Sequence, residues 1–133
     1  MTKYTIVLFG EAQKGEYGTA YLCQDLVELE ERLGEPPHHS LGLYYAVQAL
    51  LYERQLIYWR VQEEGFSFED YLEGLHLLET QQLIPEISAL ALPGVGDGRI
   101  IEASQPLCSR YHSLLILSEA DLYDYLTSSR NVP

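Results

Sequence analysis

The stretch Tyr4-Thr5-Ile6-Val7-Leu8-Phe9, followed by Gly10, has the most decisive pattern in the chain. Its β-branched and aromatic side chains favour extended backbone, and the glycine ends the run, so we predict a buried strand. Three later runs have a similar apolar character. They are Gln55–Val61, Ile87–Leu92 and Ser113–Leu117.

The segments between these strands have the spacing of amphipathic helices, while a polar loop is expected between Gly10 and the first helix. Four of the five helices are expected to open at Asp25, Ser40, Ser67 and Ser118, and the other is expected after Gly96-Asp97-Gly98. Asp25, Ser67 and Ser118 each have an acid three residues later, which is typical of a capping box. Strands alternating with such helices predict a three-layer α/β fold, with a mainly parallel sheet of about four strands and helices on both faces. The strand order stays open, and so does an antiparallel strand at one edge.

The bulk composition predicts one domain spanning residues 1–133. The length is 133 residues and 47% of them are hydrophobic, which is enough for a core without disulfides or metals. The net charge of -12 argues against nucleic acid and anionic membranes as partners. Thr5–Phe9 is too short for a signal peptide, and no apolar run would cross a bilayer, so a cytoplasmic location is expected. Cys23 and Cys108 lie in no redox or metal spacing.

Ligands of open α/β sheets bind beyond the carboxyl ends of the strands. The candidate ligand residues in those loops are Gly10, Glu11, Gly94, Gly96, Asp97, Gly98 and Ser118. Gly94-Val95-Gly96 before a helix suits an anion held on backbone N–H groups. However, the dinucleotide fingerprint and the Gly-Lys-Ser/Thr phosphate loop are both missing, and the nearby acids oppose phosphate. We therefore expect no cofactor, and the simpler interpretation is a glycine turn followed by a helix, with Ser118 as a helix cap.

Neither a catalytic residue nor a metal site is expected. His38 and His39 are adjacent in an extended connector, so their rings should point in different directions and share no metal. Cys108 and His112 are one helical turn apart, as in a thiol–imidazole pair, but no orienting group is evident. Packing of Cys108 into the core is the simpler interpretation.

The eleven tyrosines are more than a core of this size needs. The aromatic residues that gather in the second helix and second strand are Tyr44, Tyr45, Tyr52, Tyr58 and Trp59. Tyrosine is favoured at protein–protein contacts, so these five are the candidate partner contacts; packing at the core boundary is the alternative. Tyr44 and Tyr45 are neighbours on a helix, and we expect one of them to project toward a partner.

Six short pieces follow one another in a distinctive order. They are Leu33-Gly34 ending a helix, Leu43-Tyr44-Tyr45-Ala46-Val47 opening a helix, Arg60-Val61 ending a strand, Tyr71 with Leu78-Glu79 in a helix, Pro93-Gly94 ending a strand, and Cys108 in a helix. As an ordered set over about residues 26–117, they resemble the core domain of contractile tail sheath proteins from phages and related injection machines. The resemblance implies the fold and a non-catalytic, assembly-type ancestry, and it carries over no catalytic residue.

The chain also departs from that family. Sheath proteins are longer and have terminal arms that extend a neighbour's sheet, for which this chain has no room. Glu53-Arg54-Gln55 stands where the family often has a Gly-Gly turn. We therefore expect a non-catalytic protein-interaction or assembly module that binds a protein partner or itself. The alternative is a small-molecule-binding α/β domain or enzyme that uses the loops at Gly10-Glu11 and Gly94–Gly98.

Overall fold

A computed structural model describes residues 4–128. The elements in chain order are β1 (Thr5–Gly10), β2 (Ala20–Cys23), α1 (Leu26–Leu33), α2 (Gly42–Leu51), β3 (Gln55–Arg60), α3 (Phe68–Thr80), β4 (Ala89–Ala91), α4 (Gly98–Tyr111), β5 (Leu114–Ile116) and α5 (Glu119–Thr127). The four predicted strands and five predicted helices all form.

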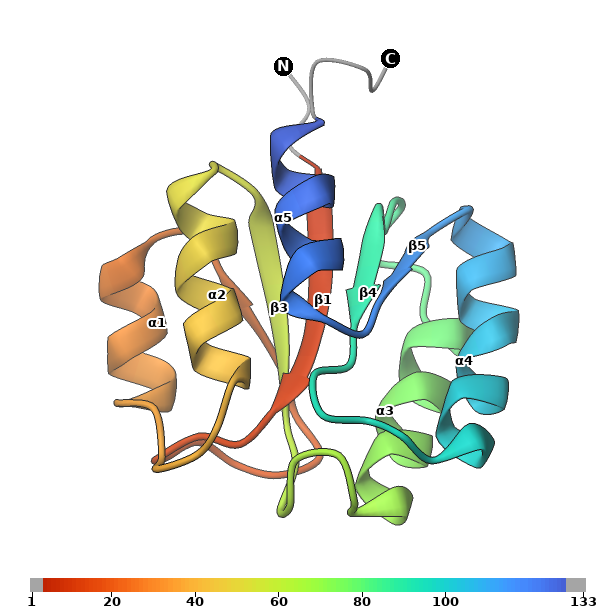
Figure 1. The fold of residues 1–133 in the computed structure, drawn as a ribbon, viewed down its shortest axis with the longest axis horizontal. Helices are drawn as coiled ribbons and strands as arrows, with labels where there is room; N and C mark the ends of the chain where they lie inside the picture. Colours follow the sequence, from red (N-terminus) through yellow and green to blue (C-terminus); the bar gives the residue numbers. More distant parts are fainter. Residues whose placement is uncertain (1–3, 129–133) are drawn as a thin grey trace.

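The strands make one five-stranded sheet in the order β2-β3-β1-β4-β5 (Figure 1). β1, β3, β4 and β5 run parallel, and β2 is antiparallel to β3. The predicted α/β class with a mainly parallel sheet is therefore confirmed. β1 lies between β3 and β4, which explains why all of its residues are buried.

The prediction missed β2, because residues 10–24 were expected to be a loop. Tyr21 and Cys23 face one side of the sheet, where Cys23 is buried and Tyr21 packs against the core. Only four residues pair with β3, so the alternation is too short to stand out in the sequence. The sequence left open whether one edge strand is antiparallel, and β2 is such a strand.

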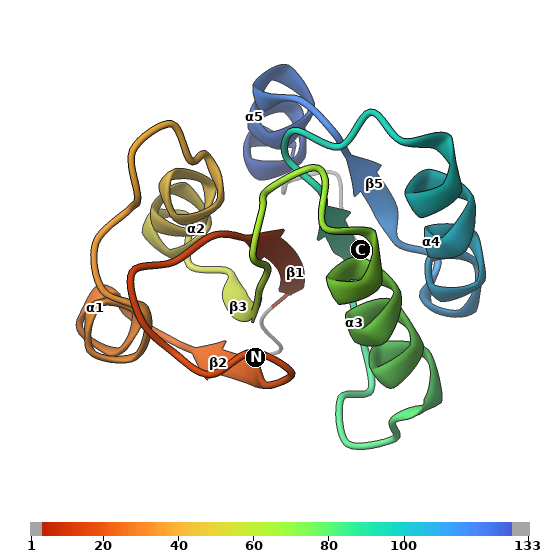
Figure 2. The same ribbon diagram turned by 90° about the horizontal axis from the view of Figure 1, so that it is seen from below.

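Helices cover both faces of the sheet, as seen from below in Figure 2. α1, α2 and α5 pack on one face, and α3 and α4 pack on the other. On β1, Ile6 and Leu8 belong to the first core cluster, while Val7 and Phe9 belong to the second. This division follows from the alternation of side chains along a strand.

Two of the predicted helix caps are confirmed. The Asp25 carboxylate accepts a 2.8 Å hydrogen bond from the N–H of Glu28 at the start of α1. The Ser118 hydroxyl accepts one of 3.2 Å from the N–H of Asp121 at the start of α5. Each satisfies one of the N–H groups that a helix start leaves without a backbone partner.

Two other predicted caps are wrong. Ser67 precedes α3, but its hydroxyl bonds the backbone of Glu63 instead of the helix. Ser40 is not the cap of α2 either, because the helix starts after Leu41, whose side chain cannot accept a hydrogen bond. The cap of α2 comes from the loop between β3 and α3.

Candidate functional site

The carboxyl ends of β1, β3 and β4 meet at one edge of the sheet. There the N–H of Glu11 donates to the Glu64 carboxylate (3.0 Å), and the N–H of Glu64 donates to the Glu11 carboxylate (2.8 Å). Gly65 touches Gly94, since a Cβ on Gly65 would lie 2.8 Å from the Gly94 carbonyl carbon. After β1 the chain continues to β2 and β3 on one side of β1, and after β3 it continues to β4 on the other side. Sheets of this kind usually bind ligands beyond the carboxyl ends of the strands where the order reverses in this way.

The Glu64 carboxylate occupies the N-terminus of α2. Besides Glu11, it accepts hydrogen bonds from the Ser40 hydroxyl (2.8 Å), the Leu41 N–H (2.7 Å) and the Gly42 N–H (3.1 Å). The N-terminus of a helix attracts anions because its N–H groups are unpaired and its dipole is positive there. In this chain, the anion is one of the protein's own side chains.

Close packing fills the rest of this edge. A Cβ on Gly10 would lie 2.7 Å from the Gly42 Cα and 2.8 Å from Glu64 Oε1, closer than a real contact allows. The Tyr58 hydroxyl donates a 2.7 Å hydrogen bond to the Glu11 carbonyl. Burial, followed by the charge of Glu64, raises the pKa of Tyr58 well above its ordinary value, so the hydroxyl stays a neutral donor. The crevice expected at Gly10-Glu11 is thus taken up by Glu64.

The other loop candidates have local roles at helix starts. Asp97 caps α4 through the Arg99 N–H (2.9 Å) and pairs with the Arg99 guanidinium at 2.8 Å, which lowers the pKa of Asp97. Gly96 and Gly98 have open space where a Cβ would stand. Ser118 is explained by its cap on α5. The structure therefore brings Gly94 to the edge that Gly10 and Glu11 share, but it does not gather all seven loop candidates into one site.

The candidate aromatic contacts divide between core and surface. Tyr45, Tyr58 and Trp59 are exposed by 2%, 0% and 1%, so their expected contact with a partner is wrong. β3 lies inside the sheet with helices on both faces, which places Tyr58 in one core cluster and Trp59 in the other. Tyr44 and Tyr52 are exposed by 46% and 40% and remain available.

Tyr44 and Tyr52 line a groove of about 460 Å³ between α2 and α5. Its lining residues are Tyr44, Gln48, Tyr52, Glu119, Ala120, Leu122, Tyr123 and Leu126, and we call it the tyrosine groove. Four of the chain's tyrosines are exposed, namely Tyr17, Tyr44, Tyr52 and Tyr123. Three of these four belong to the groove.

Tyr123 is a groove residue that the sequence analysis missed. It is exposed by 61%, although Leu122, Tyr125 and Leu126 on the same helix are buried. Leu122, Tyr125 and Leu126 have the i, i+3, i+4 spacing of one helical face, so Tyr123 lies on another face of α5. A large aromatic at an outward position was the available signal.

Arg54 joins the two walls of the groove. Its guanidinium donates to the carbonyl of Tyr52 at the end of α2 (2.8 Å) and to that of Leu126 near the end of α5 (3.4 Å). It also lies 5.0 Å from the ring centroid of Tyr125, and only 6% of the residue is exposed. Among residues 4–128 no carboxylate pairs with it, so the negative ends of two helices and an aromatic face stabilise this buried charge.

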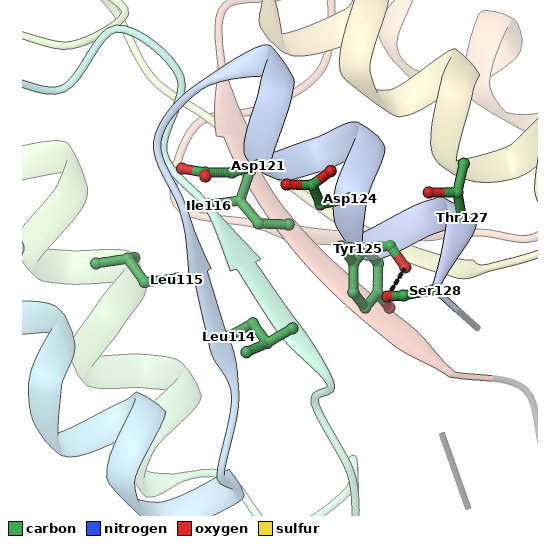
Figure 3. Close-up of a pocket in the computed structure, with 8 residues that line it drawn as sticks. All are labelled: Leu114, Leu115, Ile116, Asp121, Asp124, Tyr125, Thr127 and Ser128. Carbon is green, nitrogen blue, oxygen red and sulfur yellow. Dashed lines mark hydrogen bonds between the residues drawn. The ribbon is translucent and has the colours of Figure 1, made fainter. Parts of the chain in front are cut away.

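A second groove, of about 430 Å³, lies on the other flank of α5 (Figure 3). Leu114 and Ile116 of the edge strand β5 line one side, and Asp121 and Asp124 of α5 line the other. Since α5 contains no lysine or arginine, carboxylates are its only charged groups on either flank.

The structure places His38 and His39 in a turn, and Cys108 and His112 at the end of α4. The rings of His38 and His39 lie 3.9 Å apart, so the prediction that they diverge is wrong; a φ of 68° at His39 turns the backbone. No group of three or more potential metal ligands occurs within residues 4–128. His112 donates its backbone N–H to the Cys108 carbonyl at the end of α4, and burial raises the pKa of the Cys108 thiol. A raised pKa disfavours the reactive thiolate.

None of the helices described here combines the length and apolar character needed to span a membrane. Comparison with models of protein families, with curated proteins and with solved structures finds no match for the chain. The resemblance to tail sheath core domains therefore stays a prediction.

Proposed function

We propose that this chain is a non-catalytic protein-interaction or assembly module that binds its partner through the tyrosine groove. The observation that carries the proposal is the gathering of three of the four exposed tyrosines in one groove. Tyrosine offers a large apolar ring with a polar end and loses little conformational entropy when it is buried, which suits a protein contact. The ordered likeness to sheath proteins points to the same class of function.

The floor of the groove supports this assignment. Leu122 and Leu126 are each exposed by only 2% and provide a fixed apolar base. Arg54 ties the ends of both helices, so the rings are presented on two elements held at a set distance. Aromatic anchors on rigid supports are the groups that dominate binding energy at interfaces.

The alternative, a small-molecule site at the strand-end loops, has less support. The Glu64 carboxylate already uses the N–H groups of Glu11, Leu41 and Gly42 that an anionic ligand would need. A ligand there would have to displace a carboxylate held by all of these donors.

The proposal is tested by comparing the native chain with a Tyr44→Ser/Tyr123→Ser double variant. A photo-crosslinking amino acid at position 48, in the groove between these rings, would trap a partner in cells of the source organism, and light scattering would report self-association. We expect a complex that the double variant loses and that Tyr17→Ser, an exposed tyrosine outside the groove, keeps. A monomer that gives no crosslink at position 48 beyond those seen from position 17 would contradict the proposal.

A further inference from the structure

The charge among the residues that line the tyrosine groove is negative. Glu119 is exposed and is the only charged residue among those that line it. Within residues 4–128 it has no ion pair or hydrogen bond from its side chain. No lysine or arginine lines the groove, and the chain as a whole has a net charge of -12.

Elsewhere, the chain covers aromatic rings with its own arginines. The guanidinium carbons of Arg60, Arg99 and Arg110 lie 4.4, 4.1 and 4.8 Å from the ring centroids of Tyr17, Phe68 and Tyr111. Tyr17, the one exposed tyrosine outside the groove, therefore already has a cation over its face. No arginine of the described chain lies over Tyr44, Tyr52 or Tyr123.

Tyr44 and Glu119 lie toward the same end of the groove. Each is in the first turn of its helix, and both helices start from the edge of the sheet where the parallel strands end. The charge of Glu119 also acts on α2. Burial raises the pKa of Tyr45, and the negative charge of Glu119 is the second cause of that rise. A tyrosine face beside a free carboxylate is the pair of groups that a guanidinium binds well, because one stacks on its plane and the other accepts its N–H groups.

We infer that the tyrosine groove receives an arginine-bearing segment of another protein, with the guanidinium against the Tyr44 or Tyr123 ring and in contact with Glu119. The inference rests on the proposed function and adds the chemistry of the partner. The apolar side chains beside that arginine contact the remaining tyrosine faces and the floor formed by Leu122 and Leu126.

Charge argues against a second copy of the chain as the occupant. A second copy would bring another Glu119 to the groove and another net charge of -12. Like charges at an interface oppose association, whereas a basic partner is attracted over the whole surface as well as in the groove. A segment of opposite charge is therefore the occupant that the groove fits.

The test begins with a displayed library of random peptides, selected on the native chain and counter-selected on Tyr44→Ser/Tyr123→Ser. Peptides that depend on the groove should be enriched in arginine next to apolar residues. Replacing the arginine of the leading peptide by citrulline, which keeps the shape and removes the charge, should weaken binding about tenfold in fluorescence anisotropy. Glu119→Gln should weaken it about threefold. Glu31→Gln, which removes the same charge from an exposed position of α1, should change binding much less.

The possible outcomes separate this inference from the proposed function. Groove-dependent peptides without arginine enrichment, or equal binding of the citrulline peptide, would overturn the inference and leave the interaction module standing. Self-association of the native chain through the groove would do the same. A library with no groove-dependent peptide would count against the groove as a contact surface altogether. Thermal melts of every variant would show that the fold is kept.

Discussion

Single side chains decide what the carboxyl edge of the sheet can do. The loop after β3 contains two adjacent acids, Glu63 and Glu64, yet only Glu64 turns inward to cap α2. Its bonds span 22 to 53 residues along the chain. The Glu64 carboxylate replaces the side-chain cap that α2 lacks. The edge of the sheet where a ligand was expected therefore contributes to stability.

Glu64→Ala should lower the free energy of unfolding by about 2–3 kcal/mol, because the N-terminus of α2 loses its cap and several charge-assisted hydrogen bonds. Urea unfolding at neutral pH measures the loss. Glu63→Ala removes the same charge from an exposed neighbour and should change stability by less than about 0.5 kcal/mol. Equal effects in the two variants would show that Glu64 is not a cap.

Acetate provides a second test of the same residue. In Glu64→Ala the N–H groups of α2 are freed, so added acetate should bind there and raise the midpoint of unfolding more than in the native chain. Sodium chloride at matched ionic strength is the control. If acetate stabilises both proteins equally, the vacated position is not an anion site.

The sequence identified this edge but not its role. Gly10 and Glu11 were selected because they follow a buried strand, and they do lie at the meeting point of the loops. Glu64 is not among the candidate ligand residues. Glu63 beside it is the same residue type, and only contacts far along the chain distinguish the two. The expected cap, Ser40, follows the usual local rule, and the structure makes it a donor to Glu64 instead.

At the scale of elements, the contact between the end of β1 and the start of α2 depends on two glycines. Gly42→Ala should destabilise the fold by about 1–3 kcal/mol, because the new Cβ would lie 2.8 Å from the Gly10 Cα and 2.9 Å from Glu64 Oε1. This clash outweighs the roughly 1 kcal/mol that alanine gains over glycine in a helix. Gly98 is also the first residue of its helix but has open space around it, so Gly98→Ala should be neutral or stabilising. Thermal unfolding of both variants makes the comparison; a stabilised Gly42→Ala would contradict it.

Arg54 links the ends of α2 and α5, so its effect should be largest in α5, the last element of the described fold. Arg54→Met relieves the burial of a charge but leaves the carbonyls of Tyr52 and Leu126 without that donor. We expect a net loss of about 1–2 kcal/mol. Hydrogen exchange should accelerate more in α5 than in α3 or α4.

The matched control for Arg54 is Arg110→Met. Arg110 is exposed and donates to one loop carbonyl at 3.1 Å, so its replacement should change stability by less than about 0.5 kcal/mol. Unchanged exchange in α5 after Arg54→Met would mean that helix packing alone holds the two walls of the tyrosine groove.

For the whole molecule, the alternation of apolar runs and helical stripes was enough to predict the three-layer α/β architecture. It did not give the strand order, because pairing between β1, β3 and β4 depends on contacts across long stretches of chain. The number of tyrosines correctly indicated some surplus over the core, but a run such as Tyr58-Trp59 looks the same whether a strand lies at the edge or inside the sheet. β2 pairs with the otherwise free edge of β3, so β3 lies inside the sheet and its aromatic residues are buried.

The same buried groups make the molecule sensitive to alkali. Burial raises the pKa of Cys23 from 9.0 to about 11, and it raises the pKa of Tyr58 and Tyr71 above their ordinary value of 10.0. Below pH 9 both the folded and the unfolded chain keep these protons, so these groups make no pH-dependent contribution. Above pH 9 the unfolded chain gives up the Cys23 proton first and the tyrosine protons from about pH 10, while the folded chain retains them. Because the unfolded state then binds fewer protons, the free energy of unfolding must fall as the pH rises.

The fall should reach up to about 1.4 kcal/mol per pH unit for each group that titrates only in the unfolded state. Urea unfolding in steps from neutral pH to about pH 11 would measure it. Cys23→Ala should reduce the slope between pH 9 and about 11, and Tyr58→Phe should reduce it from pH 10 upward. A native profile that stays flat up to pH 11 would show that these groups reach solvent in the folded chain, and the packed interior described for β2 and β3 would then have to be revised.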